Sequence, residues 1–417
     1  MNILVLSSEI PATTNMAGSP RLFNLCRGLS RTNHLTLATR TQSPGRYETF
    51  RADPTSTGVF EDIIILSNPP APSWLGQQVH RLRLEAHFIT RFRQTSYHEA
   101  RCRQIRDMIE GWQFDVLYVD GLENAQYVDS RLPCPAVMDL HDCVTMLYTR
   151  KTRMERQWRR KLVLHAETWN ISRMEKALSR DFRAIIVNSP VDEAYFKTLD
   201  PTARALTIGN GVDSEFFHPS GASGDLSSLV FTGVMTYGPN EDAALYFAHD
   251  ILPLIRERHP GIRFTIVGKG PTEPVRALSA IPGIRVSGEV PDVRPYLEAA
   301  GVFVCPLRWG AGVKNKLLAA LAMGKPVVAT RESIEGLDLR DEVHLLIADT
   351  PAEFAARVLR LIGDPEYARR LGQSGRDLVA STYSWKRSGE LLEETLRSLV
   401  ARPETRHAVG AGTKRPG

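Results

Sequence analysis

Residues 302–329 read VFVCPLRWGAGVKNKLLAALAMGKPVVA, and this stretch indicates the fold class. Two short apolar runs, 302–305 and 327–329, have the length of buried strands, and a helical pattern over 314–323 lies between them. Gly324 is placed to end that helix, because glycine readily adopts the left-handed conformation found at helix C-termini. A strand, a helix and a second strand in this order predict a βαβ unit and a parallel sheet.

The same alternation of strands and helices extends along the chain in both directions. Predicted strands lie at 3–6, 35–39, 63–66, 115–119, 136–140 and 184–187 in the first half, and at 229–232, 264–267, 284–287, 302–305, 327–329 and 345–347 in the second. Helical patterns separate them, among them 21–30, 79–112, 151–178, 242–257, 291–299 and 353–362. The sequence therefore predicts an α/β protein with two Rossmann-like domains in tandem.

A turn-rich segment followed by a small, polar one separates the two halves of the chain. We predict an N-terminal domain over 1–205, a linker over 206–227 and a C-terminal domain over 228–383. A last helical pattern covers 384–400. Residues 403–417 have no apolar period and are predicted to be disordered.

Composition excludes several classes of protein. Of the 417 residues, 42% are hydrophobic and 24% charged, which excludes a disordered chain, a collagen-like repeat and a coiled coil. The net charge of +5 is too small to demand a nucleic-acid partner. Five scattered cysteines without a CxxC spacing argue against disulfides and structural zinc, so a cytoplasmic location is expected. The sequence shows no signal peptide and no apolar run of about 20 residues, so only peripheral membrane contact is expected.

The strongest chemical signal is a pair of lysines at the start of the helix over 314–323. Lys314 and Lys316 follow Gly310 and Gly312. Cations are unfavourable at a helix N-terminus, which already carries partial positive charge. The pair is explained if a dianionic group such as a pyrophosphate binds there. The alternative is that both lysines simply point into solvent.

Three other loops follow predicted strands, where ligands bind in open α/β sheets. They contain Gly18, His141 and Gly268. Each has a plain structural alternative: a βα connection for the first, a structural histidine donating to a neighbouring carboxylate such as Asp142 for the second, and a turn for the third. No loop has the G-x-G-x-x-G spacing of a dinucleotide site, which disfavours a dehydrogenase.

Together these pieces resemble family 4 of the retaining glycosyltransferases, which have the GT-B fold. Segments 231–243 and 312–316 resemble a subgroup linked to bacterial exopolysaccharide systems. The signatures in chain order are the N-terminal strand with its small-residue loop, 139–142, 185–189, 209–213 with 216–219, 267–270, 288–292 and 317–330.

The resemblance implies a cleft between two domains and a C-terminal helix that crosses back to the first domain. It also implies a nucleoside-diphosphate-sugar donor on the C-terminal domain and an acceptor hydroxyl on the N-terminal domain, from a growing glycan, a lipid-linked sugar or another molecule. Some transferases hold Mg²⁺ with an Asp-x-Asp tripeptide, which this sequence lacks. We therefore expect a metal-independent, retaining transfer with no cofactor.

The resemblance also assigns site residues. It implies a catalytic role for His141, and we infer catalytic roles for Lys314 and Lys316 from their place at the helix start. The expected donor-binding residues are Gly18, Gly233, Gly268, Gly288, Glu289, Val290, Gly312, Val313, Asn315 and Glu335.

Four positions depart from the family pattern. Ala311 and Ala319 stand where the family has two glutamates, and Val234 and Asn240 stand where it has an arginine and a lysine. We infer that the two lysines of the helix start supply the missing charge. Two alternatives stay open: a catalytically inactive binding or scaffold subunit, and a nucleotide-sugar epimerase of the same architecture.

A dense basic segment covers residues 150–161. It contains seven Arg and Lys residues against Glu155 alone, with Met154 and Trp158 between them. The pattern over 79–106 is similarly basic. Such segments bind anionic membrane surfaces or lipid-diphosphate acceptors, or they are simply solvated helix faces, and both interpretations stay open.

Overall fold

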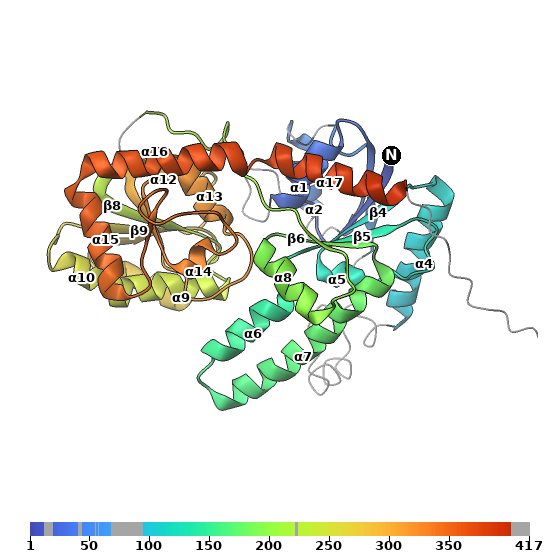
Figure 1. The fold of residues 1–417 in the computed structure, drawn as a ribbon, viewed down its shortest axis with the longest axis horizontal. Helices are drawn as coiled ribbons and strands as arrows, with labels where there is room; N and C mark the ends of the chain where they lie inside the picture. The colour runs from blue at the N-terminus through green and yellow to red at the C-terminus, as the bar shows by residue number, and fades with distance from the viewer. Residues whose placement is uncertain are drawn as a thin grey trace, which may run out of the picture.

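The computed structural model describes residues 1–11, 20–40, 44–54, 56, 58–67, 95–221 and 224–401. Two α/β domains lie side by side, and the last helices run along one side of both (Figure 1). Three expectations fall outside the described residues. They concern Gly18, the basic pattern before Thr95, and the tail at 403–417.

The N-terminal domain is built on a parallel sheet of seven strands in the order β3-β2-β1-β4-β5-β6-β7. The strands are β1 (Asn2–Ser7), β2 (His34–Arg40), β3 (Asp62–Leu66), β4 (Val116–Asp120), β5 (Ala136–His141), β6 (Ala184–Val187) and β7 (Ala205–Thr207). All six predicted strands form within one residue or so of their expected bounds. β7 pairs with β6, so the sheet continues into the segment that the sequence predicted as a linker.

Helices cover both faces of this sheet. They are α1 (Arg21–Leu29), α2 (Pro44–Ala52), α4 (Thr95–Trp112), α5 (Leu122–Ala125), α6 (Val144–Met154), α7 (Trp158–Asp181) and α8 (Pro190–Leu199). The α6 and α7 helices form an antiparallel pair that projects away from the sheet (Figure 1).

The prediction of one continuous helix over 151–178 is wrong, because the chain turns at residues 155–157. That turn reads Glu-Arg-Gln, without glycine or proline, so its sequence gives no sign of a break. Tertiary contacts instead hold the two helices antiparallel. The buried carboxylate of Glu175 in α7 accepts hydrogen bonds from the backbone N–H groups of Val144 (2.7 Å) and Thr145 (3.1 Å), which caps the start of α6 at the end of the pair away from the turn.

The C-terminal domain is built on a parallel sheet of six strands in the order β10-β9-β8-β11-β12-β13. The strands are β8 (Asp225–Thr232), β9 (Arg263–Val267), β10 (Ile284–Val286), β11 (Ala300–Cys305), β12 (Val327–Ala329) and β13 (Leu346–Ile347). The helices are α9 (Gly238–Tyr246), α10 (Leu252–Arg256), α11 (Glu273–Ala277), α12 (Arg294–Ala299), α13 (Asn315–Ala322), α14 (Arg331–Ile334), α15 (Pro351–Gly363) and α16 (Pro365–Thr382), with a π-helical turn over Phe247–Ile251 and a 3₁₀ turn over Leu278–Ala280.

The last helix, α17 (Trp385–Val400), returns to the N-terminal domain. Its buried side chains join the hydrophobic core that contains β1, and they include Trp385, Leu392 and Leu396. The helix packs on α1, where Gly28 and Gly389 face each other so closely that a Cβ on Gly28 would lie 3.2 Å from the Cα of Gly389. The expected fold, with two Rossmann-like domains and a crossover helix, is confirmed.

Two further observations concern the environment of the chain. Among the described residues, none of the helices combines the length and the apolar character that crossing a membrane would require. All five cysteines are free thiols.

Candidate functional site

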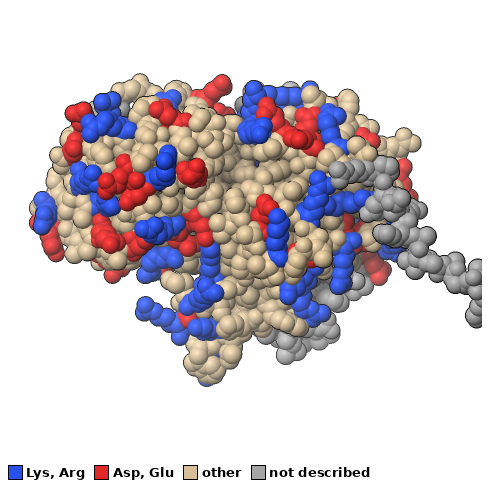
Figure 2. All heavy atoms as spheres, in the orientation of Figure 1, with Lys and Arg blue, Asp and Glu red and all other residues tan. Residues whose placement is uncertain are grey.

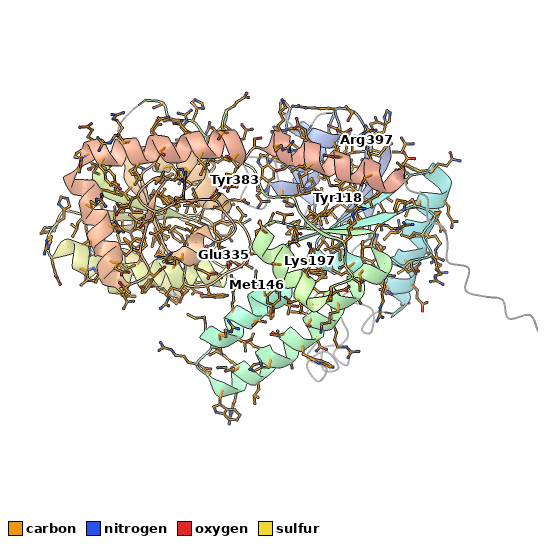
Figure 3. All side chains as sticks on the ribbon, in the orientation of Figure 1. Tyr118, Met146, Lys197, Glu335, Tyr383 and Arg397 are labelled. Carbon is orange, nitrogen blue, oxygen red and sulfur yellow. The ribbon has the colours of Figure 1, made fainter. Side chains whose placement is uncertain are left out.

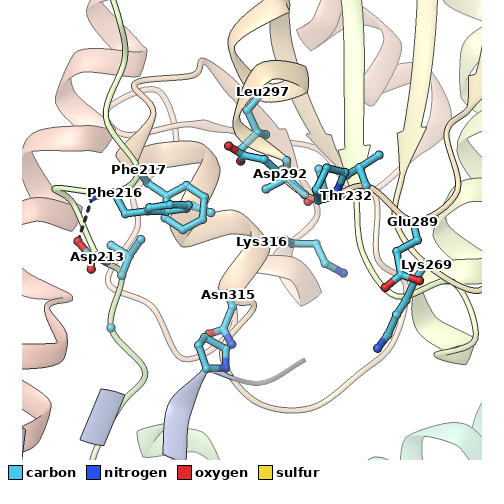
Figure 4. A pocket seen from close by; sticks show the side chains of 18 of the residues that line it. Asp213, Phe216, Phe217, Thr232, Lys269, Glu289, Asp292, Leu297, Asn315 and Lys316 are labelled. Atoms are coloured by element: carbon cyan, nitrogen blue, oxygen red, sulfur yellow. Dashed lines mark hydrogen bonds between the residues drawn. The ribbon is translucent and has the colours of Figure 1, made fainter. Parts of the chain in front are cut away.

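A cavity lies where the two domains meet, beyond the carboxyl ends of strands in the C-terminal sheet. The cavity is lined by the end of β8, the loops after β9 and β10, the start of α13 and residues of the linker between 211 and 217. Pro20, directly before α1, and Trp385, the first residue of α17, complete this part of the lining. Five residues expected to bind the donor or act in catalysis are in this lining, and they are Gly268, Glu289, Val290, Asn315 and Lys316. Lys316 and Asn315 come from α13, while Lys269 and Glu289 lie across the cavity from Phe216 and Phe217 (Figure 4).

Lys316 is the cavity lysine at the start of α13, and Lys269 is a second lysine in the lining. The Lys316 ammonium lies 5.0 Å from the centre of the Phe231 ring and donates a hydrogen bond to Oδ1 of Asn240. Burial, and to a lesser degree the nearby Lys314 ammonium, lowers the pKa of Lys316 to about 8. Because the surrounding protein solvates the Lys316 ammonium poorly, an anion bound at the N-terminus of α13 would stabilise it.

Lys314 has a different position. It is the N-cap residue of α13, only 8% of its surface is exposed, and its ammonium donates to the carbonyl oxygens of Ala311 (3.2 Å) and Gly312 (2.5 Å). The Lys314 side chain thus bonds to carbonyl groups of its own loop and stabilises the loop before α13. Its charge adds to the positive potential at the helix start, but the side chain does not line the cavity.

Glycines let the loops of the C-terminal domain approach each other. A Cβ on Gly268, whose φ is +148°, would lie 1.7 Å from the carbonyl oxygen of Gly233. A Cβ on Gly233 would lie 2.7 Å from Nδ2 of Asn240 and 3.2 Å from Nζ of Lys316. Gly288 has a φ of +71°, and its carbonyl accepts a hydrogen bond from the N–H of Gly268. These glycines allow the loops beside Lys316 to pack closely against one another.

His141 ends β5 with a left-handed backbone, φ +66°, which is uncommon for a residue other than glycine. Its Nε2 donates to Oδ1 of Asp120 at the end of β4, at 2.7 Å. Burial lowers the pKa of His141, but the carboxylates of Asp120 and Asp139 outweigh burial and raise it to about 9. His141 is therefore an imidazolium at neutral pH. The sequence-based alternative was a histidine donating to a neighbouring carboxylate such as Asp142, and the carboxylate that His141 contacts is that of Asp120.

A buried network that the sequence did not reveal supports His141. Arg21 is fully buried, and its Nε donates to both carboxylate oxygens of Asp139, at 2.9 and 3.1 Å. The Tyr118 hydroxyl donates to the same carboxylate. Arg21 also donates to the side-chain oxygen of Asn210 (2.9 Å), which in turn donates to Asn315 of α13 (2.8 Å). A chain of hydrogen bonds thus joins the β5 end to the lysine-bearing helix of the other domain.

One signal in the sequence could have pointed to this network. Asp139 sits inside an otherwise apolar strand, and a carboxylate at such a position needs a buried partner. Only the fold shows that Arg21, more than a hundred residues away in the chain, is that partner.

The donor atoms of Asp120, Asp139 and His141 lie within 4.8 Å of one another, a spacing that a metal ion could bridge. Their hydrogen bonds favour another interpretation. Asp139 already accepts from Arg21 and from Tyr118, and His141 donates to Asp120. The negative charge of the two carboxylates is balanced by the Arg21 guanidinium and the His141 imidazolium.

The two domains are also held together by Arg150 near the end of α6. Its guanidinium donates to the Gly310 carbonyl (2.8 Å), to Glu332 (2.8 Å) and to both carboxylate oxygens of Glu335 (2.5 and 2.7 Å). Figure 3 labels Glu335 at the edge of the C-terminal domain that faces α6. Glu335, which was expected to bind the donor, instead forms an ion pair with Arg150 across the domain boundary. Arg150 therefore does not belong to the exposed basic surface.

The loop before α13 carries the remaining expected residues. Gly312 has a φ of +65°, and a Cβ there would lie 1.7 Å from Oδ1 of Asp142, so only glycine permits this interdomain contact. Val313 is buried. Ala319, in place of the family's second glutamate, lines the cavity, whereas Ala311 is buried in the loop.

The fold and the cleft define the class: this is a GT-B protein. The N-terminal part matches the family model described as "Glycosyl transferase 4-like domain" over residues 18–211. The C-terminal part matches "Glycosyl transferases group 1" over residues 227–364. The chain belongs to this family of glycosyltransferases.

Curated relatives match parts of the chain. An alpha-maltose-1-phosphate synthase of Mycolicibacterium smegmatis is 26% identical over 249 residues, 52% of this chain and 63% of that protein. The putative glycosyltransferase EpsD of Bacillus subtilis is 27% identical over 225 residues, 49% of this chain and 58% of that protein. The matches thus span about 60% of the length of these relatives.

Solved structures match the whole fold. Sucrose-phosphate synthase from Thermosynechococcus elongatus superposes with a TM-score of 0.71 at 16% identity and covers 96% of this chain and 99% of its own. Anabaena HepE, solved in complex with UDP and glucose, superposes with a TM-score of 0.66 at 14% identity and covers 96% of this chain and all of its own. At these identities the likeness establishes the fold.

Proposed function

We propose that this chain transfers a sugar from a nucleoside-diphosphate sugar to an acceptor hydroxyl, with retention of configuration and without a metal ion. The observation that carries the proposal is the partly buried Lys316 at the N-terminus of α13, in a cavity between the domains. Family membership supports glycosyl transfer as the reaction class, and the UDP complexes of HepE make UDP a first base to test.

The start of α13 suits a departing diphosphate. Lys316 and the free N–H groups of the first turn of α13 would neutralise it as the bond between the anomeric carbon and the phosphate oxygen breaks. The acceptor oxygen would bond to that carbon from the same face, and its proton would pass to a phosphate oxygen. His141, as an imidazolium held by Asp120, would position the donor at the end of β5. The acceptor would be a growing glycan, a lipid-linked sugar or another hydroxyl.

A panel of nucleotide sugars, with and without candidate acceptors, tests this proposal by release of nucleoside diphosphate. A productive donor should first raise the melting temperature by mass action. Activity should persist in EDTA, and NMR of the product should show the donor's anomeric configuration. Loss of activity in EDTA that Mg²⁺ restores would refute metal independence, and an inverted product would refute retention.

The substitutions at Ala311 and Ala319 favour a second candidate, a binding or scaffold subunit without activity. That candidate predicts donor binding with no diphosphate release from any sugar. An epimerase would instead yield an isomerised sugar without acceptor consumption. The same assay distinguishes the three outcomes.

A further inference from the structure

The α7 helix carries an exposed apolar stripe. Trp158 is 67% exposed, and Leu162 and Trp169 are each 60% exposed. At about 100° per residue these three side chains lie within about 40° of one another, on a stripe about 16 Å long. The opposite face of α7 carries Leu164, Ile171 and Leu178, which are buried. Two tryptophans and a leucine exposed in line on a helix have an unfavourable hydration free energy. We therefore infer that a partner covers the stripe.

Cations surround this stripe. Six Lys and Arg residues occur between 151 and 163 against one acid, Glu155, an excess of five that equals the net charge of the whole chain. All six are exposed, and they are Lys151, Arg153, Arg156, Arg159, Arg160 and Lys161. In Figure 2 blue Lys and Arg side chains lie beside tan atoms at the lower end of the α6–α7 pair. All six cations thus lie within one short, exposed segment next to the stripe.

The tryptophans and the cations are arranged together. The Arg159 guanidinium lies 5.3 Å from the centre of the Trp158 ring, and that of Arg173 lies 4.7 Å from the centre of the Trp169 ring. Tryptophan favours the level of lipid head groups, where its ring is buried and its N–H is hydrated. Arginine at the same level meets the phosphate groups. A second copy of the chain fits poorly, because pairing two stripes would bring two such positive clusters together.

We propose that the α6–α7 helix pair docks on an anionic lipid bilayer, with Trp158, Leu162 and Trp169 inserted at the head-group level. The position of the helix pair in the fold relates the docking to the cleft. The α6 helix starts three residues after His141, and Arg150 near its end contacts the C-terminal domain. The docked surface therefore belongs to the N-terminal domain and is directly linked to the cleft.

Flotation of the full chain with vesicles tests the insertion. Vesicles of phosphatidylcholine with phosphatidylglycerol should carry the protein, vesicles of phosphatidylcholine alone should not, and high salt should release part of it. Replacing Trp158, Leu162 and Trp169 together by alanine should lower the partition at least about tenfold. The control is Trp112→Ala, which removes a tryptophan of 50% exposure at the end of α4 and should change nothing. Melting curves of the variants should match the wild type, because the altered side chains are exposed.

A pair of charge variants tests the electrostatic part. Arg159→Ala with Arg160→Ala should lower binding to anionic vesicles about tenfold or more. Arg369→Ala with Arg370→Ala on α16 removes the same charge from an exposed Arg-Arg pair elsewhere and should leave binding unchanged. Three results would overturn the proposal: no flotation of the wild type, stripe variants that float like the wild type, or a stripe that instead holds two copies together in sedimentation.

Discussion

Replacing Lys316 should move stability and donor binding in opposite directions. Its folded-state pKa of about 8 lies below the ordinary lysine value of 10.5, so the unfolded chain binds more protons between these two pH values. Stability should therefore rise with pH through this window, and the ammonium should destabilise the ligand-free protein at pH 7. Lys316→Met removes that charge and should raise the melting temperature of the ligand-free protein.

A bound diphosphate should reverse this effect. We expect the anion to return the pKa of Lys316 towards 10.5. The affinity for a nucleoside diphosphate is then highest below pH 8 and falls above it, by about tenfold between pH 7 and pH 9. His141, with a pKa of about 9, titrates close to this range and adds to the loss at its upper end. Lys316→Arg keeps a charge throughout and reports the contribution of His141 alone.

Isothermal titration of UDP at a series of pH values, together with melting curves, measures both quantities. We expect a steep profile for the wild type, a shallow one for Lys316→Arg, and weak binding with a shallow profile for Lys316→Met. Lower stability for Lys316→Met would show that the lysine holds the fold together. Equal pH profiles for the wild type and Lys316→Arg would likewise refute its role as the titrating anion receptor.

Three further predictions concern contacts away from this lysine. Asp139→Asn should destabilise the protein by about 3–5 kcal/mol in urea unfolding, because it leaves the buried Arg21 charge without its counter-ion; a loss below about 1 kcal/mol would contradict this. Arg150→Ala should cost about 1–3 kcal/mol and give a larger radius of gyration in X-ray scattering, since it frees Glu335 and its neighbours across the domain boundary; Arg150→Lys should recover part of both. Gly389→Leu should lower the melting temperature by forcing α17 from α1, at about 1–3 kcal/mol, and an unchanged melting temperature would show that the helices can part freely.

The periodic signals of the sequence predicted the fold well. Buried strands such as 302–305 are apolar throughout and bounded by turn residues, so their positions follow from local composition. The β7 strand and the turn between α6 and α7 were not foreseen. The β7 strand is only three residues long and gains its pairing from β6, and the antiparallel packing of α7 on α6 is held by Glu175, which caps the start of α6.

The candidate site was foreseen only in part. Lys316 could be found because two lysines at a helix start break a local rule of charge. Arg21, Tyr118 and Asp120 could not, because their roles depend on which strands and helices the sheet order brings together. The same limit explains Arg150, which looked like one cation of a basic surface until its three partners in the other domain were seen.

The crossover of α17 has a consequence for the order in which this chain matures. The C-terminal domain is continuous in sequence from β8 to α16, so every part of it is available once residue 382 has been made. The core beneath α1 needs Trp385, Leu392 and Leu396, which leave the ribosome after all of its other parts. The first domain to be synthesised is therefore the last to be completed, and until then its surface over α1 is open to chaperones and proteases.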